Sequence, residues 1–147
     1  MQAADQPAGE AARWDRAKAL IVVSAAMSIA LVGYAWLGAR LAAIGAVRPI
    51  WLGAGLWVLW AVSGAIGAAL TRRVRYGLLV VAIAVVAYTT LGNAAIAAVN
   101  HTHWSWSLAE PPYYLARALQ MNLVLGLVIG GAAAWAASKW QQRRLPA

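Results

Sequence analysis

Two histidines are the residues of this chain best suited to chemistry. His101 and His103 stand two apart in the segment 100–104, and in an extended loop that spacing places both imidazoles on one side. With a third ligand, for which Glu110 and Met121 are the candidates, the pair could hold Zn or Cu. Two histidines alone do not make a metal site. The alternative is that they join the neighbouring tryptophans in an aromatic belt at the membrane interface, with no cofactor.

Polar and aromatic side chains surround this pair on its C-terminal side. Glu110 precedes the expected start of a helix, where the helix dipole favours a carboxylate, and it could pair with Arg117. Arg117 and Gln120 are three apart, so they are neighbours on a helix surface. The cluster is either a polar rim at the headgroups or a shallow site for an anionic headgroup, a quinone or the loop of a partner. The predicted contact residues are Trp104, Trp106, Glu110, Tyr113, Tyr114, Arg117, Gln120 and Asn122.

The segment 99–114 is the longest loop that the sequence predicts, and it is rich in tryptophan and tyrosine. Pro111 and Pro112 stiffen it and argue against a helix that starts earlier. Large aromatic side chains on a stiff loop are typical of contact surfaces between proteins. We therefore interpret this loop as the main hint of a binding function.

Little else in the chain is suited to catalysis. There is no cysteine, which excludes disulfides, thiolate metal sites and cysteine nucleophiles. The four acidic residues, Asp5, Asp15, Glu10 and Glu110, all fall outside the apolar runs. An ionisable group inside a span is the usual mark of function in a membrane protein. We therefore predict no catalytic residue and favour a role that is not enzymatic.

Four apolar runs must position these residues. The chain of 147 residues is 63% hydrophobic and 11% charged, whereas soluble domains have about 45–50% apolar and about 25% charged residues. About 20 helical residues cross a hydrocarbon core of about 30 Å. The runs stay apolar over that length without the alternation of barrel strands, so they are helical. The expected spans are 19–39, 49–70, 76–98 and 115–140.

These spans predict an all-α integral membrane protein, a four-transmembrane-helix bundle that forms a single membrane domain over 1–147. Residues 1–12 are small and polar, and we expect a disordered tail there. The connection 40–48 is unusually apolar for a loop, so it either extends the first helix or lies along the membrane surface.

The basic residues predict the orientation of the spans. Alternate crossing places nine of the twelve on one side and three, Arg40, Arg48 and Arg117, on the other. By the positive-inside rule both termini are cytoplasmic, in a bacterial inner membrane, and the loop 99–114 faces outward. Because the basic residues gather at the ends of the spans and not on one soluble face, nucleic acid is not an expected partner.

Small residues four apart predict how the spans pack, because they let helix backbones approach closely. Gly126 and Gly130 form such a step in the last span, and Gly64 and Ala68 form one in the second. We expect them to pack within the bundle, and the alternative is a surface for a second copy or a partner. Trp57 and Trp60 lie deep in the second span. We expect both to fill space in the core, and the alternative is that they face lipid or a bound pigment, quinone or lipid tail.

Three functions fit these observations. The first is a non-catalytic accessory or structural subunit of a larger inner-membrane complex, which contacts partners through small-residue faces and the tryptophan-rich loop. The second is a small oligomeric transporter or channel, whose path is lined by Ser63, Thr89, Thr90 and Asn93. The third is a membrane enzyme or a metal- or quinone-binding protein that uses His101 and His103. The expected partners are the lipid bilayer and other membrane subunits or further copies of the chain.

Overall fold

The computed structural model describes residues 6–104, 106 and 114–144, and every regular element within these ranges is a helix. One of these helices is a π-helical turn, η1, which joins the α-helices on either side of it without a break. The elements are α1 (Gln6–Ala43), α2 (Pro49–Thr71), α3 (Val74–Ala87), η1 (Tyr88–Gly92), α4 (Asn93–Val99) and α5 (Tyr114–Arg144).

Four helical segments are long and apolar enough to cross a membrane, as the apolar runs predict. They are Trp14–Ala43, Ile50–Thr71, Val74–Val99 and Tyr114–Arg143. Most of their large apolar side chains point outward, which a bilayer tolerates and water does not. The chain therefore has the architecture of a multi-pass helical membrane protein.

The first helix is longer than the sequence indicated, at both ends. It begins at Gln6, so the boundary expected at residue 19 is corrected, and residues 6–12 of the expected disordered tail are helical. Alanines favour the helical backbone in this segment, and Pro7 stands in the first turn, where a proline is tolerated. At its other end α1 continues to Ala43, so the apolar connection does extend the helix, before Gly45 turns the chain with a positive φ of 71°.

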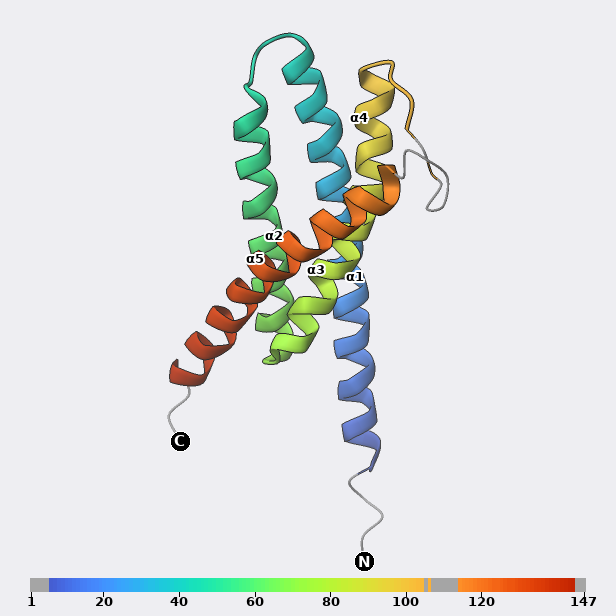
Figure 1. Cartoon of the computed structure of the whole chain (residues 1–147). Coiled ribbons are helices and arrows are strands. Elements are labelled where there is room, and N and C mark those ends of the chain that lie inside the picture. The colour runs from blue at the N-terminus through green and yellow to red at the C-terminus, as the bar shows by residue number, and fades with distance from the viewer. Residues whose placement is uncertain (1–5, 105, 107–113, 145–147) are drawn as a thin grey trace, which may run out of the picture.

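Figure 1 shows how the helices are arranged. α1 runs up, α2 runs down, α3 continues through η1 into α4 on the way up, and α5 crosses obliquely back down. The first turns of α1, the α2–α3 turn and the last turns of α5 lie at one end of the bundle, called the turn end here. The connection between α1 and α2 and the end of α4 lie at the opposite, loop end. Within the described residues, α2 and α3 each pack against both α1 and α5, whereas α1 and α5 do not pack against each other.

A stripe of buried residues on α2 provides the centre of the bundle. Its members recur at the helical spacing of one face, from Leu56 and Trp60 through Ser63, Gly64, Gly67, Ala68 and Thr71. Trp60 is only 1% exposed and meets the ring of Tyr88 edge to face, with centroids 6.3 Å apart. The prediction of core filling is confirmed for Trp60 and is wrong for Trp57. Trp57 is 51% exposed because it lies just beside the buried stripe.

Glycines bring α2, α3 and α5 into backbone contact. A Cβ at Gly64 would overlap the carbonyl oxygen of Gly130, and one at Gly77 would lie 2.5 Å from the carbonyl oxygen of Gly64. One at Gly126 would lie 2.5 Å from a methyl group of Val85. The small-residue step of α5 therefore packs within the chain, as expected. A partner must use a different surface from these faces of α2 and α5.

Candidate functional site

A buried polar pair joins the third and fourth spans. Thr89 is fully buried in η1, and its hydroxyl oxygen accepts a hydrogen bond from the Asn122 side chain on α5 at 3.1 Å. The side-chain amide of Asn93 donates a hydrogen bond to the backbone carbonyl of Thr89 at 3.1 Å, and this carbonyl belongs to the π-helical turn. Such turns are often found at functional sites. Here the turn places Thr89 where a side chain from another helix reaches it.

The polar residues that would line a transport path bond mainly to their own helices. Ser63 donates to the Leu59 carbonyl at 2.7 Å, and Thr90 donates to the Val86 carbonyl at 2.8 Å. Neither residue lines either of the two cavities described below. These bonds satisfy hydroxyl groups in an apolar span, so the residues need no aqueous path to explain them.

The contact between Thr89 and Asn122 fixes the depth at which α5 begins. Thr89 lies near the middle of the 26-residue span Val74–Val99, and α4 continues ten residues beyond it, about 15 Å at the rise of an α-helix. Tyr114, where α5 begins, precedes Asn122 by only eight residues, about 12 Å along an oblique axis. Figure 1 shows the same relation, because the first turn of α5 lies below the end of α4. The first turns of α5 therefore lie inside the depth of the bundle.

Two polar side chains of α5 are exposed at this depth. Gln120 precedes Asn122 by two residues, and Arg117 precedes Asn122 by five. They therefore lie about 3 Å and about 7.5 Å closer to the start of the helix than Asn122 does. At about 100° per residue, Gln120 points roughly opposite to Asn122, away from α3. Half the thickness of a hydrocarbon core is about 15 Å. Both side chains therefore leave the bundle within its depth and not at the loop end.

The exposed face of α5 forms a continuous stripe, named the α5 ridge here. Polar residues occupy its first turns and apolar residues follow them. Its members are Tyr114, Arg117, Gln120, Met121, Val124 and Val128, and all six side chains are exposed. Three of the predicted contact residues thus share one surface, whereas Asn122 faces the bundle interior.

The predicted histidine pair lies at the loop end. His101 and His103 are both exposed, and His101 has a positive φ of 53°, a turn conformation. Among the described residues no group of three histidines, cysteines or acidic residues could hold a metal ion, and Met121 lies on α5 within the bundle's depth. Glu110, proposed as the third ligand, lies outside the described residues, as does Tyr113. Trp104 is half-buried and Trp106 is exposed.

One cavity, of about 390 Å³, opens at the loop end between α1, α2 and the η1–α4 segment. Its lining is almost wholly apolar or small, with the side chains of Tyr34, Tyr88 and Asn100 as its polar groups. The Tyr34 hydroxyl already donates to the Leu52 carbonyl at 2.8 Å. This cavity resembles the irregular surface that acyl chains fill around a bundle, and it brings no reactive groups together.

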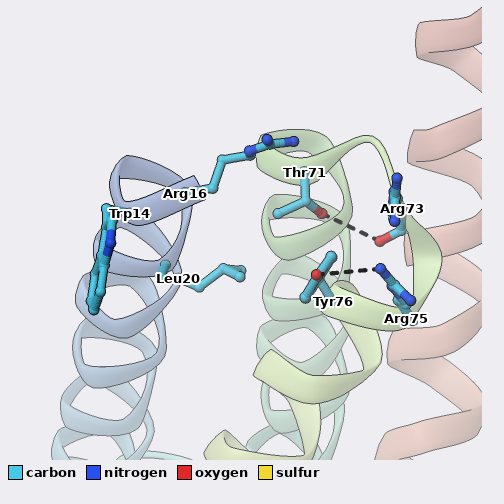
Figure 2. A pocket seen from close by; sticks show the side chains of 8 residues that line it. Trp14, Arg16, Leu20, Thr71, Arg73, Arg75 and Tyr76 are labelled. Carbon is cyan, nitrogen blue, oxygen red and sulfur yellow. Dashed lines mark hydrogen bonds between the residues drawn. The ribbon is translucent and has the colours of Figure 1, made fainter. Parts of the chain in front are cut away.

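A larger cavity, of about 690 Å³, lies at the turn end between α1 and the α2–α3 turn, and it is named the turn-end cavity here. Figure 2 shows Arg16 reaching from α1 toward that turn, with Leu20 below it and Thr71 and Tyr76 on the opposite wall. Its lining is Trp14, Arg16, Ala17, Leu20, Thr71, Arg73, Arg75 and Tyr76. Among the side chains that the structure describes, this lining carries three guanidinium groups and no carboxylate.

The sequence reading placed the basic residues at this end but did not group them into a site. Arg16 and Arg75 are nearly sixty residues apart, so only the fold brings them to one cavity. The signal that could have found them is the alternation of crossings, which returns residues 14–20 and 71–76 to the same end. The Thr89–Asn122 pair was missed for a different reason. The hydropathy of α5 does not indicate how far this helix is shifted along α3 and η1, so the facing residues could not be paired.

Comparisons with known proteins do not extend these observations. No family model, no curated protein and no solved structure matches this chain. What the residues themselves support is a four-span membrane bundle with two distinct features. These are a polar ridge exposed on α5 and a basic cavity at the turn end.

Proposed function

We propose that the protein is a non-catalytic subunit of a larger assembly in a bacterial inner membrane, and that the α5 ridge binds another membrane protein. The observation that carries this proposal is the exposure of Gln120 and Arg117 within the depth of the bundle. Polar side chains facing lipid are costly, and in membrane proteins they usually face protein or water. A partner helix that packs against the ridge would remove them from lipid.

The ridge also fits a partner helix in shape and chemistry. Tyr114, Met121, Val124 and Val128 follow one helix face, the spacing by which helices pack side by side. Met121 is 63% exposed and Val128 is 66% exposed, so the described part of the chain leaves them largely uncovered. The partner would supply a hydrogen-bond acceptor for Gln120 and a carboxylate or carbonyl for Arg117. The tryptophan-rich loop would add contacts beyond the membrane.

The orientation is part of the same proposal. The turn end carries most of the basic residues, namely Arg16, Lys18, Arg72, Arg73, Arg75, Lys139 and Arg143 among those whose side chains are described. The positive-inside rule places such an end in the cytoplasm. The loop 99–114 and the histidine pair then face outward, on the side from which the ridge begins.

Site-specific photocrosslinking in the membranes of the native host tests the ridge. A benzophenone amino acid is introduced at Met121 on the ridge or at Ile29 on α1, which is 73% exposed and serves as the matched lipid-facing control. We expect irradiation to give one discrete protein adduct from position 121 and none from position 29. The adduct is identified by mass spectrometry.

A pair of bulky variants then links the adduct to assembly. Met121→Trp should reduce stoichiometric co-purification of the crosslinked protein by about tenfold or more, because it blocks close helix packing. Ile29→Trp should leave it unchanged. An adduct of twice the mass of the chain would instead show self-association and contradict a separate partner. Equal crosslinking from both positions would show that the ridge faces lipid.

A further inference from the structure

We propose that the turn-end cavity binds the phosphate group of an anionic phospholipid. The one observation that requires explanation is a cavity of about 690 Å³ with arginines from two separate helices at its rim and apolar side chains in its wall. The proposal does not depend on the α5 ridge or on a partner, because the cavity lies between α1 and the α2–α3 turn.

The charge of the cavity selects an anion. Arg16 comes from α1, whereas Arg73 and Arg75 come from the turn and the start of α3. Arginine presents several N–H donors in a planar fork that matches phosphate oxygens. Arg75 lies over the ring of Tyr76, with its guanidinium carbon 4.9 Å from the centroid. This packing holds the Arg75 side chain at the wall of the cavity, and it does not neutralise the positive charge because the tyrosine ring carries no net charge.

The turn is built tightly, which fixes the wall opposite α1. Arg72 adopts the left-handed conformation with φ of 56°, and the Thr71 hydroxyl donates to the Gly67 carbonyl at 2.8 Å. A Cβ at Gly67 would lie 2.9 Å from the Cα of Gly77, so α2 and α3 are in close contact here. Figure 1 shows α1 standing apart from this pair at the same level. The cavity is therefore the space between a tight hairpin and a separate helix.

The start of α3 adds to the attraction for an anion. Arg73 is the N-cap residue, and its side chain makes no capping hydrogen bond. The first amides of a helix carry partial positive charge, which favours a negative group nearby. The helix start alone would not make a site. Together with Arg73 and Arg75, which line the cavity, it favours a negative group at the rim.

The apolar part of the wall selects a lipid over a soluble phosphate. Ala17, Leu20 and Trp14 line the α1 side, and Leu20 lies deeper along the span than Arg16. The cavity therefore joins a basic rim to an apolar wall on α1, as an amphiphile with a phosphate head and acyl chains requires. Basic pockets between spans bind anionic headgroups in this way.

Native mass spectrometry of the full chain in mild detergent tests the proposal. The protein is titrated in parallel with phosphatidylglycerol, with phosphatidylcholine and with inorganic phosphate. We expect one retained phosphatidylglycerol, bound at least about tenfold more tightly than phosphatidylcholine, and no retention of inorganic phosphate alone. Retention of inorganic phosphate with equal affinity would support the anion site and overturn the lipid as its source.

Three variants separate a built site from general surface charge. Arg73→Gln with Arg75→Gln should abolish the preference for phosphatidylglycerol, whereas Lys139→Gln with Arg143→Gln removes the same charge from α5 outside the cavity and should preserve it. Leu20→Trp fills the cavity without changing charge and should weaken phosphatidylglycerol binding by about tenfold. Equal losses in the two charge variants, or full binding by Leu20→Trp, would overturn the proposal. Because Leu20→Trp keeps every arginine, it remains informative if either charge variant misfolds.

Discussion

The two halves of the bundle differ in how closely their helix backbones approach one another. Toward the turn end, α2, α3 and α5 meet backbone to backbone through Gly64, Gly77 and Gly130. Toward the loop end, the contacts are made by side chains, among them the Thr89–Asn122 pair and the bond from Tyr34 to the Leu52 carbonyl. In lipid, where burial of apolar surface drives helix association only weakly, both close packing and polar bonds hold helices together.

Backbone contacts and side-chain contacts differ in how easily they can be rearranged. A backbone contact has no rotamers, so any added atom at the glycines must move a whole helix. A side-chain contact can be remade by rotation or replaced by a water or a partner. The turn-end half of α2, α3 and α5 therefore acts as the fixed frame, and the loop-end half, where α5 begins within the depth of the bundle, is the part whose contacts can be remade.

Gly64→Ala should have the largest effect on stability, because it changes a backbone contact of the turn-end half. The new methyl group would overlap the Gly130 carbonyl oxygen, a backbone atom that cannot rotate away. We expect a loss of stability of about 3 kcal/mol, at the upper end of the usual cost of overpacking, measured by reversible denaturation in detergent.

Gly53→Ala is the matched control on the same helix, because a Cβ there has no atom within 4 Å. It should be neutral or stabilising by up to about 1 kcal/mol, since alanine favours a helix more than glycine does. A loss in Gly53→Ala equal to that in Gly64→Ala would show that helix propensity, and not the backbone contact, decides the outcome.

The glycine contacts are also where the sequence was most informative about packing. The step from Gly126 to Gly130 predicted close approach within the bundle, because its spacing follows from the helix itself. It did not identify Gly64 and Gly77 as the facing positions. That pairing depends on how far each helix is shifted along its neighbour, and an apolar run does not encode this shift.

Removing the buried polar pair should have a smaller effect. In a double-mutant cycle of Thr89→Val and Asn122→Leu, we expect a coupling of up to about 1.7 kcal/mol, the maximum found for polar pairs between membrane helices, whose average is about 0.6 kcal/mol. Denaturation of the wild type, both single variants and the double variant measures it. A coupling indistinguishable from zero would mean that α5 is placed by packing alone, and the depth assigned to Arg117 would then lose its main support.

Tyr34→Phe should have the smallest effect of the three. It removes the hydrogen bond from α1 to the Leu52 carbonyl and keeps the ring, so we expect a loss of about 0.5–1 kcal/mol. The same denaturation assay measures it, with Tyr76→Phe at the turn end as a control whose hydroxyl receives only a long bond, 3.4 Å, from Arg75. If the control costs as much as Tyr34→Phe, the contribution of the Leu52 bond is not specific.

The candidate site was predictable only in part. Hydropathy located the spans because each helix in lipid must satisfy its own backbone, whatever surrounds it. The exposure of Arg117 and Gln120 follows from where α5 begins and how it tilts against its neighbours. The turn-end cavity follows from the distance between α1 and the α2–α3 turn. Both are tertiary properties, and the residues concerned have no unusual local pattern.

The π-helical turn has a consequence for the ancestry of this chain. A turn of this kind holds one residue more than the α-helical path around it, so η1 can be read as an old insertion within 88–92. Deleting one residue there would let the turn close to a regular α-helix and keep α4, with its buried Ala97, facing the same neighbours. Relatives of this chain should therefore separate into two length classes at η1. An alignment that places a gap anywhere else in the third span would pair residues that face different helices.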